Sequence, residues 1–370
     1  MIKKILSTAS LFLLLIFFFS VTALGAEKDS DDGDCFSEFI EEFSKVIPSE
    51  SGVSLEEGEL INSVGFDGIF GGIVNSLLGK KSEIFAFFLT VIGFAVLSAV
   101  CEAASFSDKV TKSAVSVGVP VIMSASIYPT VYSVFCSVGE SLQSVVGFFG
   151  AALPVMTAIT TASGSVKTAG VQAMNMNITL GIVGAVATGI LLPLSFAMLA
   201  LALVSSFGDA GTSKVAKGIK GAFAFGLGIV TAVSSAAIAL QTVIASASDS
   251  ASLRAARYAA SGLIPVVGSS VSSALSTLAG GFAYAKSTVG AAAIAVVAVM
   301  SIAPLISLLI YRMIFSIAVS FLEYADNPAG ARCFSAYRTA FDTVISVYVM
   351  STLVCIIQLI VFIKGGGSIT

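Results

Sequence analysis

Residue types that commonly carry catalysis are scarce in this chain. It has no histidine, which removes the most frequent general base and the most frequent metal ligand. We therefore expect no histidine-dependent serine protease, no metal and no cofactor. The cysteines are too widely spaced to form a metal-type pair: Cys35, Cys101, Cys136, Cys333 and Cys355.

Two local patterns suggest nucleotide binding or proteolysis, but each lacks residues that the chemistry requires. Gly79-Lys80-Lys81-Ser82 resembles the end of a phosphate-binding loop, but that motif requires Gly at position 74 and Ser or Thr at position 81. An aspartyl protease needs two close acids. Asp209 is expected in a loop, and Asp342 at a helix start, where the helix dipole favours a carboxylate. We predict that the chain is not an enzyme.

Polar side chains inside long apolar segments are the remaining candidates for function, because lipid disfavours them. Arg312 interrupts one such segment, and we expect its side chain to reach toward the membrane interface. No row of acids and no charged pair near mid-membrane is evident, which disfavours an ion-driven carrier. The other candidates are Glu102, Asn175, Asn177, Gln241 and Gln358.

The composition requires lipid as the main solvent. Hydrophobic residues make up 56% of the 370 residues, charged residues only 11%, and the mean hydropathy is +1.00. Soluble domains have about 25% charged residues. Of the 22 acidic residues, 13 lie in residues 27–67. The net negative charge and the lack of histidine also argue against nucleic-acid binding. The expected partner is the lipid bilayer.

Helices that cross a bilayer need about 20 mainly apolar residues. Two further apolar segments, residues 144–162 and 259–283, each have a proline near the start and many small polar residues. We predict an all-α, polytopic membrane protein of six to eight transmembrane helices, in which these two segments either span or form re-entrant loops. The clear candidates for spans are 84–101, 114–138, 178–206, 221–247, 289–311 and 343–363.

An internal repeat is suggested by two pairs of proline motifs at one offset. Pro154 and Pro265 are 111 residues apart, as are Pro193 and Pro304, and each pair shares apolar neighbours. Membrane transport proteins often contain such repeats. The positive-inside rule does not choose between eight spans and six, because both arrangements place eight basic residues inside.

The proline segments are candidates for a pore-lining or conformationally active element, with Pro154, Pro265 and Gly268 as the residues concerned. Broken helices expose carbonyl groups that can line a polar path. The alternative is that these prolines only kink packed helices. Glycines such as Gly181, Gly184 and Gly226 are expected to bring helix backbones close together.

The N-terminal region predicts export and docking. Residues 1–26 have two lysines, an apolar run and small residues at the end, which is typical of a signal peptide. An acidic extracytoplasmic segment, residues 27–80, follows. In it Phe36, Phe39 and Phe43 recur at helical spacing and are candidates for docking a partner. The membrane domain then covers residues 84–363, and residues 364–370 form a short extracytoplasmic tail.

Three motifs carry a resemblance to a known family. They are the run Arg-Tyr-Ala-Ala-Ser-Gly-Leu-Ile-Pro-Val-Val-Gly at 257–268, Leu-Pro-Val at 153–155 and Asp-Asn-Pro at 326–328. With the signal peptide, the acidic segment and the membrane domain, they make the chain resemble the stage III sporulation protein AE family. The resemblance is strongest over residues 145–363.

The resemblance implies a function that composition does not. Members of that family are expected in the mother-cell membrane around the forespore, where they join other stage III sporulation membrane proteins and a forespore-membrane partner in a channel or secretion-like complex. That complex supports late forespore gene expression. The alternative is a stand-alone transporter or permease for a small solute.

Overall fold

The computed structural model describes residue 45 and residues 79–104, 109–162, 166–205, 214–236, 239 and 268–364. Over these residues the secondary structure is helical, and six helices are long and apolar enough to cross a membrane. The prediction of an all-α polytopic membrane protein is thereby confirmed. The predicted signal peptide, the segment with Phe36, Phe39 and Phe43, and Pro265 lie outside the described residues.

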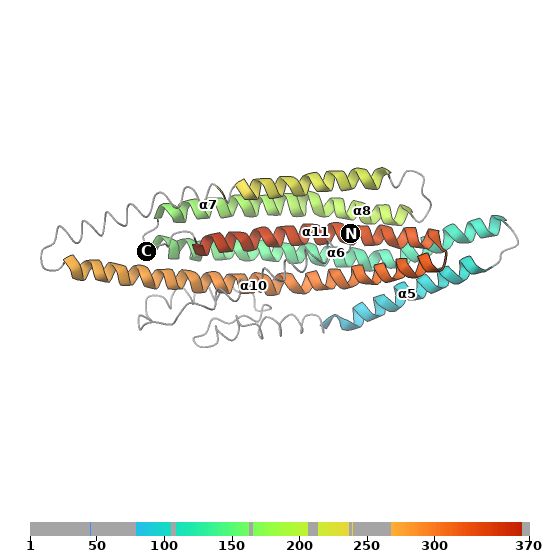
Figure 1. The fold of residues 1–370 in the computed structure, drawn as a ribbon, viewed down its shortest axis with the longest axis horizontal. Coiled ribbons are helices and arrows are strands. Elements are labelled where there is room, and N and C mark those ends of the chain that lie inside the picture. Colours follow the sequence, from blue (N-terminus) through green and yellow to red (C-terminus); the bar gives the residue numbers. More distant parts are fainter. Residues whose placement is uncertain are drawn as a thin grey trace.

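The helices form one elongated bundle of nearly parallel rods (Figure 1). Helices α10 and α11 make a hairpin that packs against α6 and α8, and α5 lies against α10 and α6. Helices α7, η2 and α8 follow one another directly, with η2 a π-helical stretch. The bounds are α5 Lys81–Ala103, α6 Lys109–Ala162, α7 Val166–Ile182, η2 Val183–Leu191, α8 Leu192–Ser205, the helix Lys214–Ala236, α10 Gly268–Tyr324 and α11 Pro328–Lys364.

The central helices are much longer than a bilayer is thick. Helices α6 and α10 have 54 and 57 residues. At 1.5 Å per residue each is over about 80 Å long, against about 30 Å of hydrocarbon. In contrast, α5 and the helix Lys214–Ala236 have 23 residues each, which matches a single crossing. Part of the bundle must therefore extend beyond the membrane.

The first proline segment neither forms a separate span nor turns back. Residues 144–162 are the last part of α6 and continue directly from residues 114–138. Pro154 lies inside this helix on its exposed side. A proline removes one backbone hydrogen bond, and a long packed helix tolerates that loss. The described part of the second proline segment is likewise the beginning of α10.

The α10–α11 hairpin contains the densest aromatic packing. The rings of Phe315 and Tyr337 stack at a centroid distance of 5.4 Å and an interplanar angle of 6°. Phe341 lies 5.6 Å from Phe315. From α5, Phe87 contacts the Phe315 ring edge-on at 5.7 Å. The Tyr337 hydroxyl lies 2.7 Å from Ser124 Oγ, which ties α11 to α6.

The Asp-Asn-Pro motif forms the tip of this hairpin. Asp326 adopts a positive φ of 51°. Asn327 caps α11, because its Oδ1 accepts a hydrogen bond from the Gly330 amide at 2.9 Å. Its Nδ2 donates to the carbonyl oxygen of Ser98 at 2.9 Å and to Ser98 Oγ at 2.7 Å, so the same side chain fastens α5. A Cβ at Gly330 would lie 3.0 Å from Ser98 Oγ, so close packing requires glycine there.

The π-helical stretch η2 ends two residues before Pro193. The amide of Leu192 donates to the carbonyl of Ala187, five residues back. Proline at 193 has no amide proton, and its ring crowds the carbonyl four residues earlier. The wider π turn is one way in which a helix accommodates such a residue without breaking.

The expectation that glycines bring helices together is largely wrong. Only Gly226 among the three named above approaches a neighbour, where an added Cβ would lie 2.8 Å from Leu191 Cδ2. At Gly181 and Gly184 an added Cβ would meet nothing within 4 Å. Gly181 is exposed and Gly184 is half-buried, and neither packs closely against another described helix.

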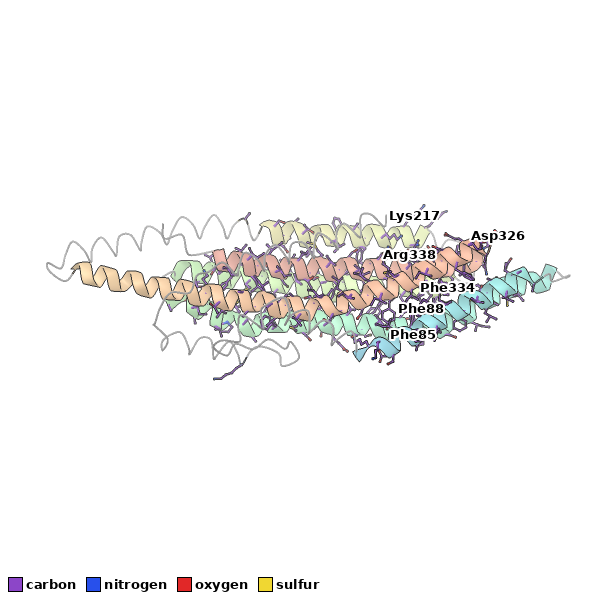
Figure 2. All side chains as sticks on the ribbon, turned by 60° about the horizontal axis from the view of Figure 1, so that its bottom comes forward. Phe85, Phe88, Lys217, Asp326, Phe334 and Arg338 are labelled. Carbon is purple, nitrogen blue, oxygen red and sulfur yellow. The ribbon has the colours of Figure 1, made fainter. Side chains whose placement is uncertain are left out.

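One end of the bundle is basic. The ends of α5, α8 and α10 and the starts of α6, α11 and the helix Lys214–Ala236 gather there (Figure 1). Lys217, Asp326 and Arg338 lie toward that end in Figure 2. We call it the basic end, because the helix starts there contain Lys109, Lys112, Lys214, Lys217, Lys220 and Arg332.

The hairpin tip generates a stability prediction. Replacing Asn327 with Ala removes the α11 cap and leaves buried groups of Ser98 without a donor, so Asn327→Ala should lower the free energy of unfolding by roughly 1–3 kcal/mol. Thermal unfolding of the purified protein in detergent measures this. The matched control is Tyr324→Ala, since that side chain is 92% exposed at the same tip. Equal stability of the two variants would contradict the role of Asn327.

Candidate functional site

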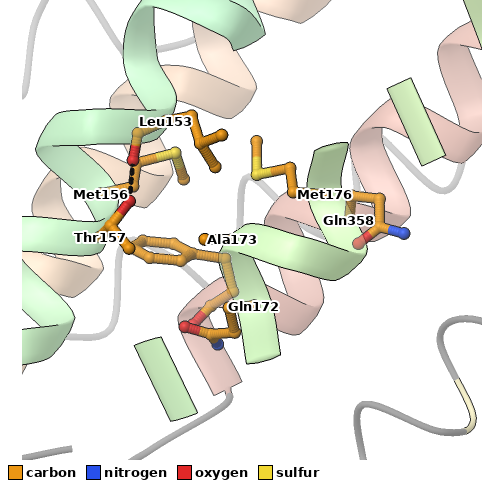
Figure 3. Close-up of a pocket in the computed structure, with 8 residues that line it drawn as sticks. Leu153, Met156, Thr157, Gln172, Ala173, Met176 and Gln358 are labelled. Carbon is orange, nitrogen blue, oxygen red and sulfur yellow. Dashed lines mark hydrogen bonds between the residues drawn. The ribbon is translucent and has the colours of Figure 1, made fainter. Parts of the chain in front are cut away.

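The first candidate site is a polar network at the end of the bundle opposite the basic end. There the last turns of α6 meet α7 and the last turns of α11 (Figure 3). Amide and hydroxyl side chains are buried among apolar ones, although the surrounding helices are strongly hydrophobic. The buried polar residues are Thr160, Gln172, Asn175, Thr179 and Gln358.

Hydrogen bonds link the network across three helices. Gln358 of α11 donates through Nε2 to Thr179 Oγ1 at 2.7 Å. Its Oε1 accepts from Asn175 Nδ2 at 3.4 Å. Gln172 Nε2 donates to the carbonyl of Phe362 at 3.4 Å, and Thr160 Oγ1 lies 3.5 Å from Gln172 Oε1. Such bonds satisfy groups that would otherwise be costly to bury, and they bind α7 to α11.

A small cavity borders this network. Its volume is about 10 Å³, which is the room that one water molecule needs. Apolar side chains make up most of the wall, while Thr157, Gln172 and Gln358 supply polar atoms. The Thr157 hydroxyl donates to the carbonyl of Leu153 on its own helix. The cavity is too small for an organic substrate.

Of the two described residues of the predicted proline site, only Pro154 lies near the polar network. Pro154 itself is exposed, and its neighbours Leu153 and Thr157 are the residues that face the cavity. Gly268 is the first residue of α10, whose first turns extend past the other labelled helices (Figure 1). Pro265 lies outside the described residues, so a shared site of the three residues stays a prediction.

The second candidate site is an ion pair between α10 and α11. Arg312 Nε lies 2.5 Å from Asp342 Oδ1, and the two side chains are only 11% and 21% exposed. The expectation for Asp342 is wrong, because it lies well inside α11, which begins at Pro328. The expectation for Arg312 is also wrong, since its guanidinium pairs with a carboxylate instead of reaching alone toward the interface.

The depth of this ion pair along the bundle can be judged from its neighbour α5. Phe87 contacts Tyr311 at a centroid distance of 5.0 Å, next to Arg312. Phe87 is six residues after Lys81 and 16 before Ala103, or about 9 Å and about 24 Å along the helix. If α5 crosses the membrane, the ion pair lies within it. Such a pair is not evident from the sequence, because its two members are 30 residues apart on different helices.

Sequence reasoning identified some of these residues and missed others. Asn175 and Gln358 were singled out separately, and the structure brings them into contact. Gln172 and Thr179 were missed, although Gln172, Asn175 and Thr179 follow the i, i+3, i+7 spacing of one helix face. That spacing is a signal that could have revealed the polar face of α7.

The ion pair generates a second prediction. Arg312→Ala or Asp342→Ala leaves one largely buried charge without its partner and should cost roughly 3–5 kcal/mol of stability. The double variant Arg312→Met, Asp342→Leu should recover most of that loss. Thermal unfolding in detergent of all three variants gives the coupling energy. If the double variant loses as much stability as the two single variants together, the two side chains do not interact.

Comparison with known proteins places the chain in a family. The family model for stage III sporulation protein AE matches residues 53–366. The stage III sporulation protein AE of Bacillus subtilis (strain 168) is 21% identical over 229 residues, which are 62% of this chain and 57% of that protein. The matched region is thus less than two thirds of that relative. No solved structure matches. Because the family model covers most of its residues, the chain belongs to the stage III sporulation protein AE family.

Proposed function

We propose that the chain is a non-enzymatic membrane subunit of a channel or secretion-like complex between mother cell and forespore, required for late forespore gene expression. The observation that carries this proposal is the family match over residues 53–366. The six apolar helices of the described residues support a multi-pass membrane subunit. We propose that its membrane is that of the mother cell. Its partners would be other stage III sporulation membrane proteins and a protein of the forespore membrane.

The arrangement of the helices supports an orientation for this subunit. The ends of α5, α8 and α10, the starts of the helices that follow them and the basic residues of those starts lie at the basic end. The positive-inside rule assigns such an end to the mother-cell cytoplasm. The polar network and the first turns of α10 would then lie toward the space between the two membranes, on the same side as the acidic segment with Phe36, Phe39 and Phe43.

Outward-facing glycines support a role in assembly. Gly181, Gly221 and Gly228 are exposed, and an added Cβ would meet nothing within 4 Å. Glycine costs a helix about 1 kcal/mol relative to alanine, and in lipid small residues mark the surfaces where helices associate. We propose that neighbouring subunits pack on these surfaces, that Phe36, Phe39 and Phe43 dock a partner, and that Pro154, Pro265 and Gly268 belong to the conformationally active segments.

The second candidate function is a stand-alone transporter for a small solute. The ion pair of Arg312 with Asp342 favours it, because a buried charged pair in a membrane is a common element of substrate and ion pathways. The two functions differ in their dependence on partners. A transporter works alone in proteoliposomes, whereas a channel subunit requires its complex.

An in-frame deletion in the host tests the proposed function. The expected result is arrest after engulfment, with a silent late-forespore reporter and shrinking forespores, and rescue by the intact gene. Fluorescence microscopy of starved cells measures all three. Normal spores would contradict the sporulation role, and solute uptake by the purified chain in proteoliposomes would then establish the transporter.

Assembly through glycine surfaces is tested separately. Gly181→Leu adds bulk on an open surface, so it should reduce co-purification with other membrane proteins of the complex while leaving thermal unfolding of the subunit unchanged. The contrasting variant is Gly226→Leu, which should destabilise the subunit itself because an added Cβ lies only 2.8 Å from Leu191. If the Gly181→Leu protein co-purifies normally, the surface around Gly181 is not a contact with another subunit.

A further inference from the structure

The accessible face of α11 next to the basic end is almost entirely polar. Between positions 332 and 346, Ala336 is the single apolar residue among those that are partly or fully exposed. In a chain with 11% charged residues, such a run is unexpected. The polar residues of this face are Arg332, Ser335, Arg338, Thr339, Asp342 and Ser346.

Helix α10 presents a matching polar edge. Arg312, which pairs with Asp342, is followed at intervals of one turn by Ser316 and Ser320. The edge of α10 beside this one is apolar: Met313, Ile317 and Phe321 are 58%, 49% and 39% exposed. One edge of the same helix thus suits lipid and the other does not. We call the polar edge of α10 together with the polar face of α11 the polar seam.

The polar seam runs alongside a helix that fits the membrane. It extends from the hairpin tip, where Asn327 bonds Ser98 of α5, to the ion pair, which lies near the level of Phe87. Its length from Arg332 to Ser346 is about 21 Å at 1.5 Å per residue. The exposed face of α5 at these levels is apolar and includes Leu89, Val96 and Leu97.

Contact with lipid would be energetically costly for the charged residues of the polar seam. The hydroxyls of Thr339 and Ser346 donate to the carbonyls of Ser335 and Asp342 on their own helix, so these two side chains alone would tolerate lipid. Arg338 and the pair of Arg312 with Asp342 carry full charges, and a charge in the hydrocarbon region is costly unless water or protein surrounds it.

We propose that the polar seam lines a water-filled groove that opens at the basic end, reaches the ion pair and admits small hydrated ions. Its basic residues are Arg312, Arg332 and Arg338. The acidic residues on these two helices are Asp342, Glu323 and Asp326. The three positive and three negative charges balance, so the seam favours neither anions nor cations.

Cysteine labelling of the full-length chain tests the groove. In a background with the five native cysteines replaced by Ala, Thr339→Cys and Ser316→Cys are exposed to membrane-impermeant thiosulfonate reagents on inside-out vesicles. The matched controls are Ile317→Cys and Leu97→Cys, which lie on the apolar faces of α10 and α5. Variants count only if they elute as a single species after purification.

The expected result is at least tenfold faster labelling at both seam positions than at both controls, with anionic and cationic reagents alike. Adding Arg338→Gln leaves an excess of negative charge, so the cationic reagent should then label faster than the anionic one. Slow labelling at the seam in vesicles and in the purified protein would overturn the groove. Fast labelling only after purification would also overturn it and would identify the seam as a contact with another protein. A groove in the subunit itself does not depend on the sporulation role, so the deletion phenotype and the labelling result can fail separately.

Discussion

The packing of α10 on α11 is the interaction on which the rest of the bundle depends. These two helices make more contacts with each other than any other pair, and the remaining elements attach to them. The stack of Phe315 on Tyr337 lies at the centre of this packing, and it also contacts Phe87 of α5. In lipid the hydrophobic effect does not hold helices together, so ring packing and buried hydrogen bonds must do so.

That requirement explains where polar groups occur in so apolar a chain. Tyr337 bonds Ser124 between α11 and α6, and Asn327 bonds Ser98 between the hairpin tip and α5. Gln358 bonds Thr179 between α11 and α7. Each of these bonds joins helices far apart in the sequence, and each satisfies groups that lipid would leave unpaired. These buried polar groups thus serve assembly of the bundle.

The ion pair of Arg312 with Asp342 differs from these bonds. It lies at the edge of the hairpin, where the polar edge of α10 meets the polar face of α11. A hydrophobic pair would pack the two helices equally well. The cost of holding charges at this level is therefore better explained by contact with a polar medium than by stability. This distinction separates the seam from the fully buried network around Gln358.

Much of the architecture followed from the sequence. Composition alone required a membrane protein, and the apolar segments located the six helices, because each must supply its own backbone hydrogen bonds in lipid. The motif at Asp326 and Asn327 also acts locally, through a cap and a positive φ. Resemblance in three short motifs pointed to the family that the comparisons then showed.

Other features could be decided only by the tertiary structure. Hydropathy divides α6 at residues 139–143, but the structure has one continuous helix there, in which Val138, Leu142 and Val145 are buried against neighbouring helices. Charge counting left six and eight spans equal, whereas the described residues contain six helices long and apolar enough to cross a membrane, and the helix starts at one end are rich in basic residues. The sequence predicts Asp342 at a helix start and Arg312 at the membrane interface, and only the packing of α10 on α11 shows that they form an ion pair. Sequence patterns report the solvent that each residue prefers, but pairing across helices depends on how those helices are placed in three dimensions.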